Sequence, residues 1–158
     1  MNKMEETLNY RPSAAAVVIN SAGELLVCER IDSSGAWQFP QGGADEGENI
    51  EVAMVREVEE EIGLKREDYE ILKSKSGYQY LFGSGEKVKQ GTVYHGQDQT
   101  YFLIQVKDGV EPDVEQKDQE FTQAKWIKPS EFEADWLPKF KREVYGQVLQ
   151  DFFGTDLV

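Results

Sequence analysis

The segment from Gly42 to Leu64 constrains the fold of this chain more than any other, because it joins a glycine-rich loop to a sequence with helical periodicity. Apolar side chains recur there three and four residues apart, at Met54, Val55, Val58 and Ile62. We therefore expect a helix over residues 49–62, and Gly63 stands where a C-terminal cap ends a helix. One face of this helix must be buried, and the opposite face must remain free.

Three carboxylates share the free face of the predicted helix. At about 100° per residue, Glu57, Glu60 and Glu61 lie within roughly 100° of one another. Glu59 points well away from them. Such crowding is repulsive without a counterion, and a bound divalent cation removes the penalty. Oxygen ligands suit Mg²⁺ or Mn²⁺, and the spacing permits more than one ion. A solvated acidic helix is the alternative, and the glycine-rich loop before the helix argues against it.

Two further charged residues complete the candidate catalytic set with Glu57. Arg56 immediately precedes the carboxylates, and Glu48 stands at the helix entrance. We expect these two side chains to pair and thereby to orient the carboxylates that hold the metal. Glu48 also stabilises the positive end of the helix dipole.

The rest of the chain predicts an α/β protein in which strands and helices alternate. Residues 13–20 and 24–30 are expected to form a hairpin through Ser21-Ala22-Gly23. Further strands are expected at residues 37–40, 69–82, 99–106 and 123–127, and a helix start at residues 129–131. A C-terminal helix over residues 137–153 carries apolar residues at helical spacing, which we interpret as core: Phe140, Val144, Val148, Leu149 and Phe152.

Length and composition favour a single domain over residues 1–158, with 39% hydrophobic residues. No apolar run approaches the roughly 20 residues of a membrane-spanning helix, so no membrane association is expected. The polar N-terminus does not resemble a signal peptide, and Cys28 is expected to be a small core residue. These features predict a cytoplasmic enzyme. The net charge of -13 opposes nonspecific attraction to nucleic acid.

The segment resembles the Nudix box, G-x5-E-x7-R-E-U-x-E-E-x-G-U, where U is a bulky aliphatic residue. All nine specified positions match: Gly42, Glu48, Arg56, Glu57, Val58, Glu60, Glu61, Gly63 and Leu64. The resemblance implies a Nudix fold, with a mixed β-sheet sandwiched between α-helices. It also implies cleavage of a nucleoside diphosphate linked to another group, with divalent metal held by Glu57, Glu60 and Glu61.

Outside the box, three stretches are similar to bacterial RNA pyrophosphohydrolases and plant-type diadenosine tetraphosphate hydrolases: YRPSAAAVVI, WQFPQGGADEGE and GQDQTYFLIQ. The resemblance implies that Glu120 is an additional metal ligand. The candidate substrate-binding residues are Arg11, Gly42, Gly43, Lys87, Lys89, Gln97, Gln99 and Tyr101. Tyr101 stands where this subgroup leads us to expect tryptophan. His95 is interpreted as structural, while Tyr78 and Tyr80 are expected in the core, with base stacking as the alternative.

We therefore hypothesise that magnesium held by the box glutamates activates a water for attack on a phosphate, with Glu57 as general base. Two substrates remain open. The negative net charge favours a dinucleoside polyphosphate, such as diadenosine tetraphosphate cleaved to ATP and AMP, over an RNA. The alternative is removal of pyrophosphate from the 5' end of triphosphorylated RNA. A non-catalytic nucleotide-binding or interaction module is the third hypothesis, and the oligomeric state stays open.

Overall fold

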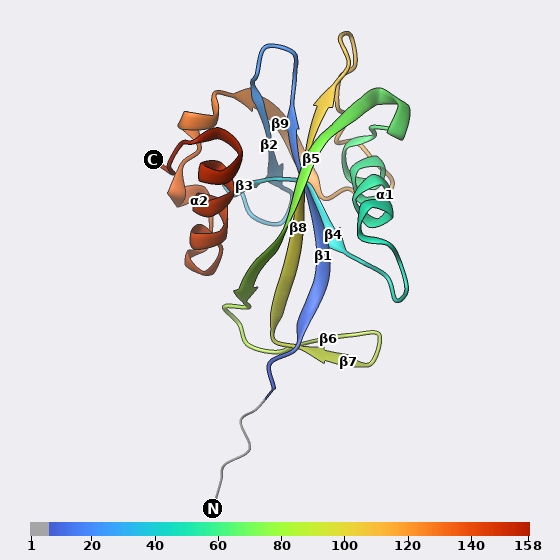
Figure 1. Ribbon diagram of the computed structural model, residues 1–158, viewed down its shortest axis with the longest axis vertical. Helices are drawn as coiled ribbons and strands as arrows, with labels where there is room; N and C mark the ends of the chain where they lie inside the picture. Colours follow the sequence, from blue (N-terminus) through green and yellow to red (C-terminus); the bar gives the residue numbers. More distant parts are fainter. Residues whose placement is uncertain (1–6) are drawn as a thin grey trace, which may run out of the picture.

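The computed structural model describes residues 7–158, and a mixed sheet of seven strands forms the centre of that part of the chain (Figure 1). Its main path runs β3-β2-β1-β8-β5, with β4 paired to β1 and β9 paired to β2. The strands are β1 (Tyr10–Ile19), β2 (Leu25–Arg30), β3 (Trp37–Gln38), β4 (Gln41–Gly43), β5 (Tyr69–Leu81), β8 (Gly96–Val106) and β9 (Phe121–Ile127). A separate hairpin consists of β6 (Lys87–Lys89) and β7 (Thr92–Tyr94).

The two α-helices cover opposite faces of the sheet, α1 (Ile50–Ile62) on one side and α2 (Lys139–Phe153) on the other (Figure 1). Short 3-10 turns span Arg66–Asp68, Pro129–Glu131 and Ala134–Trp136. The expected α/β architecture, a mixed β-sheet sandwiched between α-helices, is confirmed. None of the helices within residues 7–158 is long and apolar enough to cross a membrane.

Strand β1 lies at the centre of this sandwich. It runs parallel to β8 in continuous register from Tyr10 to Ile19 and antiparallel to β4. Ala14 and Ala16 pack on the α1 side, whereas Ala15 and Val17 pack on the α2 side. Both faces are covered, which explains why this strand is an unbroken run of apolar residues from Ala14 to Ile19.

The predicted hairpin of the first two strands is correct only at its turn. The turn closes through Asn20 and Glu24, but β1 and β2 pair only at Ile19 and Leu25. Beyond that point β1 pairs with β8, and β2 pairs with β9 and β3. The strands separate because each finds a longer partner elsewhere in the chain, which a local pattern does not report.

Helix α1 ends where the sequence predicts. The Asn49 side chain accepts a hydrogen bond from the Glu51 backbone N–H at 2.9 Å, and Gly63 adopts a left-handed φ of 68° beyond the last turn. Met54, Val58 and Ile62 are buried against the sheet, as their spacing predicts, and Val55 is half-buried. The helix is therefore held in one rotation about its axis.

The predicted core stripe of the C-terminal helix requires one correction. Val144, Val148 and Leu149 are buried, but Phe140 is 37% exposed and Lys141 is only 8% exposed. The Phe140 ring packs against Gly83, where a side-chain carbon would overlap it. The first turn of α2 therefore faces a cleft, and the core begins one turn later.

The β6–β7 hairpin was not predicted. Its turn contains Gln90 and Gly91, which both have positive φ, of 51° and 79°. The sequence signal for this hairpin was the dipeptide Gln90-Gly91. It lies between Val88 and Val93, which are opposite each other on the two strands. Thr92 and Tyr94 then lead into β8, which begins at Gly96, three residues earlier than expected.

Candidate active site

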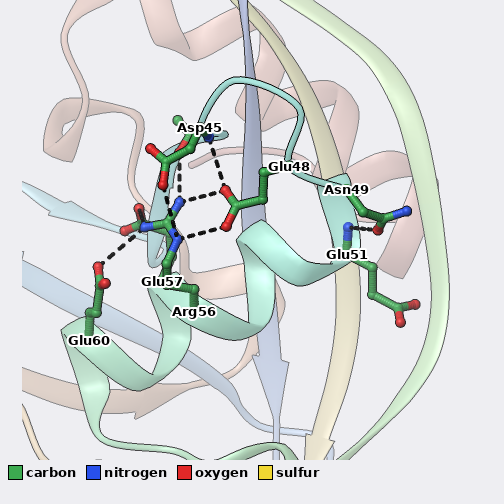
Figure 2. Close-up of polar contacts among 8 residues, drawn as sticks. Asp45, Glu48, Asn49, Glu51, Arg56, Glu57 and Glu60 are labelled. Carbon is green, nitrogen blue, oxygen red and sulfur yellow. Dashed lines mark hydrogen bonds and ion pairs between the residues drawn. The ribbon is translucent and has the colours of Figure 1, made fainter. Parts of the chain in front are cut away.

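Arg56 connects the loop before α1 to the carboxylates on it (Figure 2). Its Nε and Nη2 donate to the two carboxylate oxygens of Glu48 at 2.9 and 2.8 Å, so the predicted pair is present. Nη2 also donates to the Gly43 carbonyl at 3.0 Å, and Nη1 donates to Glu57 Oε1 at 2.7 Å and to Glu60 at 3.4 Å. One guanidinium therefore sets the position of the loop and the orientation of Glu57.

Glu48 closes the same loop from the other side. Its carboxylate accepts a hydrogen bond from the Asp45 backbone N–H at 2.9 Å. The hydrogen bonds from Arg56, and then that from Asp45, lower the pKa of Glu48 to about 2. Glu48 therefore stays ionised at neutral pH and remains a partner for Arg56.

Two glycines leave the space that the charged side chains occupy. A side-chain carbon on Gly42 would lie 2.0 Å from the carboxyl carbon of Glu57, and one on Gly43 would lie 2.1 Å from the guanidinium carbon of Arg11. The Glu57 carboxylate thus rests directly on the β4 backbone. Gly42 and Gly43, both predicted as substrate contacts, leave space for these two side chains. Gly42 also lines a cleft together with Glu57 and Glu61.

Glu57 and Glu61 form a desolvated carboxylate pair. Glu61 is buried, and burial followed by the charges of Glu57 and Glu120 raises its pKa well above the usual range. Burial also raises the pKa of Glu57, against the opposing effect of Arg56. Buried carboxylates without a matching cation are costly, so a hard divalent ion fits this oxygen donor set.

Glu120 comes from the segment before β9 and lines the same cleft as Glu57 and Glu61. Glu60 is largely exposed and borders a second cavity of about 850 Å³ along α1, which Glu59 also lines. Glu57, Glu61 and Glu120 line this second cavity as well, so all four predicted metal ligands border it. Within residues 7–158, no three acidic, histidine or cysteine side chains are already drawn together as a metal site. Arg56 contacts Glu60 through Oε2 alone, at 3.4 Å, so the other carboxylate oxygen is available to a metal ion.

A cleft of about 400 Å³ extends from the carboxylates toward α2. Its acidic end is formed by Glu57, Glu61 and Glu120. Its other walls carry four cationic side chains, Arg30, Lys87, Lys89 and Lys141. Aromatic rings of Tyr80, Phe82 and Phe140 lie among them. The arrangement suits an anionic, aromatic ligand whose phosphates reach the carboxylates, which is what a nucleotide polyphosphate offers.

The predicted substrate residues of β8 divide into one that lines the cleft and two that do not. Gln97 lines it, and its side-chain oxygen accepts hydrogen bonds from Ser13 and Tyr80, both at 3.0 Å. Gln99 and Tyr101 are both 0% exposed, so direct substrate contact is not compatible with their positions. Tyr101 donates to Gln99 at 2.8 Å, so the pair supports the cleft wall from behind.

The remaining predicted contacts also differ in position. Lys87 and Lys89 line the cleft from β6, as expected. Arg11 instead borders a neighbouring cavity of about 340 Å³, which Lys89 also reaches. His95 accepts a hydrogen bond from the Asn9 backbone N–H at 2.9 Å and lies 3.5 Å from Glu86, consistent with its structural interpretation.

Sequence reasoning missed the cations that α2 and β2 supply. Arg30 ends β2, and Lys141 lies in the first turn of α2. Burial, then the positive charges of Arg30 and Lys87, lower the pKa of Lys141 to about 8. The only local signal was a lysine within the apolar pattern of the last helix, where the facing element was not known.

A family model described as the NUDIX domain matches residues 9–151. The chain belongs to the Nudix hydrolase family. This Nudix hydrolase is therefore an enzyme that acts on phosphoanhydride bonds, and the hypothesis of a non-catalytic module is not supported. Enzymes of this family generally use divalent metal ions.

The curated relatives cover nearly all of the chain. An RNA pyrophosphohydrolase of Campylobacter jejuni subsp. doylei is 33% identical over 153 residues, which cover 94% of this chain and 96% of the relative. The RNA pyrophosphohydrolase of Actinobacillus pleuropneumoniae serotype 5b is 38% identical over 159 residues, with 92% and 72% covered. A solved C. elegans Ap4A hydrolase complex has a TM-score of 0.56 at 21% identity, covering 75% of this chain and 80% of that one, and supports the fold alone.

Proposed function

We propose that this Nudix hydrolase removes pyrophosphate from the 5' end of triphosphorylated RNA. The observation that carries the proposal is the cleft in which Arg30, Lys87, Lys89 and Lys141 stand beside the acidic end. Relatives named RNA pyrophosphohydrolase, at 33% and 38% identity, support the same substrate.

This proposal reverses the preference drawn from net charge. The value of -13 describes the whole surface, whereas a phosphate chain responds most strongly to the charges a few ångströms away. Glu48 is already paired with Arg56, so its charge does not oppose the cleft cations fully. The local field at the basic walls therefore permits binding of an RNA 5' end despite the acidic chain.

Each part of the cleft has a role in binding. Lys141 carries its charge at neutral pH, because its pKa of about 8 lies above 7, and it is partly desolvated, which strengthens its attraction for phosphate. Lys87 and Lys89 project from the β6–β7 hairpin toward the same space. The exposed face of Phe140 is available to stack on a nucleobase near the phosphates.

We further propose that Glu57, Glu60, Glu61 and Glu120 hold magnesium, with manganese as a substitute. A divalent ion held there would supply Lewis-acid chemistry, activating the attacking water and offsetting charge on the leaving pyrophosphate. Glu57 accepts the proton of the attacking water, and Arg56 Nη1 at 2.7 Å from its Oε1 holds that carboxylate in orientation.

A dinucleoside polyphosphate is the second candidate substrate. Tyr80, Phe82 and Phe140 place aromatic rings beside the phosphate-binding cations, which also suits the base of a small nucleotide. In that case diadenosine tetraphosphate is cleaved asymmetrically to ATP and AMP.

The deciding experiment compares the rates of the purified chain on a short 5'-triphosphorylated RNA and on diadenosine tetraphosphate, at equal magnesium and moderate salt. We expect a higher kcat/KM on the RNA, with pyrophosphate released. Glu57→Gln is the control for contaminating activity. A higher kcat/KM on the dinucleotide would reject the RNA proposal in favour of the second candidate.

A further inference from the structure

Arg30 does not face the cleft as a free cation. Its Nε and Nη2 donate to the two carboxylate oxygens of Asp32 at 2.9 and 2.7 Å. Arg30 is the last residue of β2, and Asp32 lies two positions later in the loop that follows. The Arg30 backbone N–H donates to the Ala36 carbonyl and closes this loop. Glu29 holds the same loop by accepting from the Gly35 N–H at 2.9 Å.

The pair lies where two cavities meet. Arg30 lines the substrate cleft and also an adjoining cavity of about 460 Å³ between the loop after β2 and the start of α2. Phe140 lines both cavities as well. Both Arg30 and Asp32 keep solvent access, so neither is locked in a buried ion pair.

The charges of Arg30 and Asp32 both act on Lys141, which lines the cleft. Arg30 lowers the pKa of Lys141, whereas Asp32 opposes that effect. Asp32 therefore stands close enough to the cationic wall to offset part of its positive charge. A polyphosphate that enters the cleft meets Arg30, whose guanidinium is already paired with Asp32.

We propose that Asp32 is a specificity-determining residue that competes with substrate phosphate for Arg30. Both Asp32 and a phosphate require the planar fork of donors that Arg30 presents, and they cannot use the same edge at once. The competition weakens binding of the phosphate chain most when that chain is long enough to reach Arg30 from the metal-binding end. This inference rests on the proposed function for the location of the cleft, but not for the identity of the nucleoside.

The test uses Asp32→Asn, which keeps the shape of the side chain and removes its charge. Binding of inorganic tripolyphosphate and of pyrophosphate is measured by calorimetry at pH 7 with magnesium, in a Glu57→Gln background that prevents consumption of the probe. Removing the Asp32 charge frees Arg30 from an exposed ion pair, which should tighten tripolyphosphate binding about two- to fivefold. Pyrophosphate binding should tighten less.

Asp108→Asn is the matched control, because it makes the same charge change away from the cleft. Asp108 lies in the exposed turn that follows Val106, the last residue of β8. It should leave both affinities unchanged. An equal gain from Asp108→Asn would reduce the effect to net charge and overturn the proposal.

A double-mutant cycle with Arg30→Gln separates competition for Arg30 from direct repulsion of the ligand. In the Arg30→Gln background, Asp32→Asn should give only a smaller gain in tripolyphosphate binding, because its charge still acts on Lys141. A gain as large there as in the parent background, or weaker binding of Asp32→Asn in the parent background, would overturn the proposal. Asp32→Ser provides a second variant if the first fails to fold. Because the probes carry no nucleoside, failure of the RNA proposal leaves this result interpretable.

Discussion

Substitution of Gly42 by alanine should damage catalysis without damaging the fold. The added carbon would lie 2.0 Å from the Glu57 carboxyl carbon and 2.3 Å from each of its oxygens. Ordinary contact begins near 3.4 Å, so the carboxylate must retreat by more than about 1 Å. A misplacement of about 1 Å in a catalytic group costs on the order of 10²-fold in rate. We therefore expect kcat to fall by about 100-fold.

The fold should survive because the displaced atoms are the far end of a flexible side chain, and Gly42 does not need positive φ. Thermal unfolding followed by circular dichroism should show a Tm within a few degrees of wild type. Gly43→Ala is the matched control, since its added carbon meets the flexible guanidinium of Arg11 on the other side of β4. It should retain most of the activity.

The reasoning is refuted if Gly42→Ala turns over at the wild-type rate, or if both alanine variants lose activity equally. A large fall in Tm for Gly42→Ala would attribute the loss to folding instead of to the position of Glu57. Saturating magnesium should not rescue the variant, because the alanine methyl group occupies the position of the Glu57 carboxylate at any metal concentration.

Glu57→Gln should abolish most turnover with an unchanged Tm, and near-normal rates at saturating magnesium would contradict its assigned role. The Lys141 charge is present below its pKa of about 8 and lost above it, so KM should rise as pH increases through 8, and Lys141→Met should flatten that part of the KM profile. Hydrogen bonds from Tyr78 and then Lys75 lower the pKa of Asp151 to about 2. The ionised carboxylate therefore adds stability above pH 4, and this stability is lost as pH falls toward 2. Asp151→Asn should lower Tm at pH 7 but not at pH 2. Burial raises the pKa of the Cys28 thiol, so this thiol should react with a thiol reagent only after unfolding. Fast reaction of the native protein would contradict its core position.

Predictions from the sequence were most accurate where the interaction partners are close along the chain. Helix α1 begins after Asn49 and ends at Gly63 because both caps are local hydrogen-bonding and backbone effects. The pairing of Glu48 with Arg56 follows for the same reason, since the residues lie eight positions apart on one loop and helix. The contacts of the β6–β7 hairpin are also local, and its Gln90-Gly91 turn was a usable signal. The strand patterns around it obscured this signal.

Predictions failed where the environment of a side chain depends on a distant element. Phe140 has the spacing of a core residue, but its ring lies against Tyr80 of β5 and against Gly83 in the turn after β5, so it borders the cleft. Gln99 lies on the expected strand, yet its side chain is fully buried and forms hydrogen bonds with the side chains of Gln41 and Tyr101. Periodicity indicates which residues share a face, and it does not indicate what that face meets.

The sequence by itself therefore determined the family, the helix that carries the carboxylates, and the arginine that orients them. These depend on residues within one segment, Gly42 to Leu64, where backbone geometry fixes distances directly. Only the tertiary structure decided the character of the cleft. Arg30, Lys87 and Lys141 come from three separate elements, and their charges act together only because the fold brings those elements to the same cleft as Glu57.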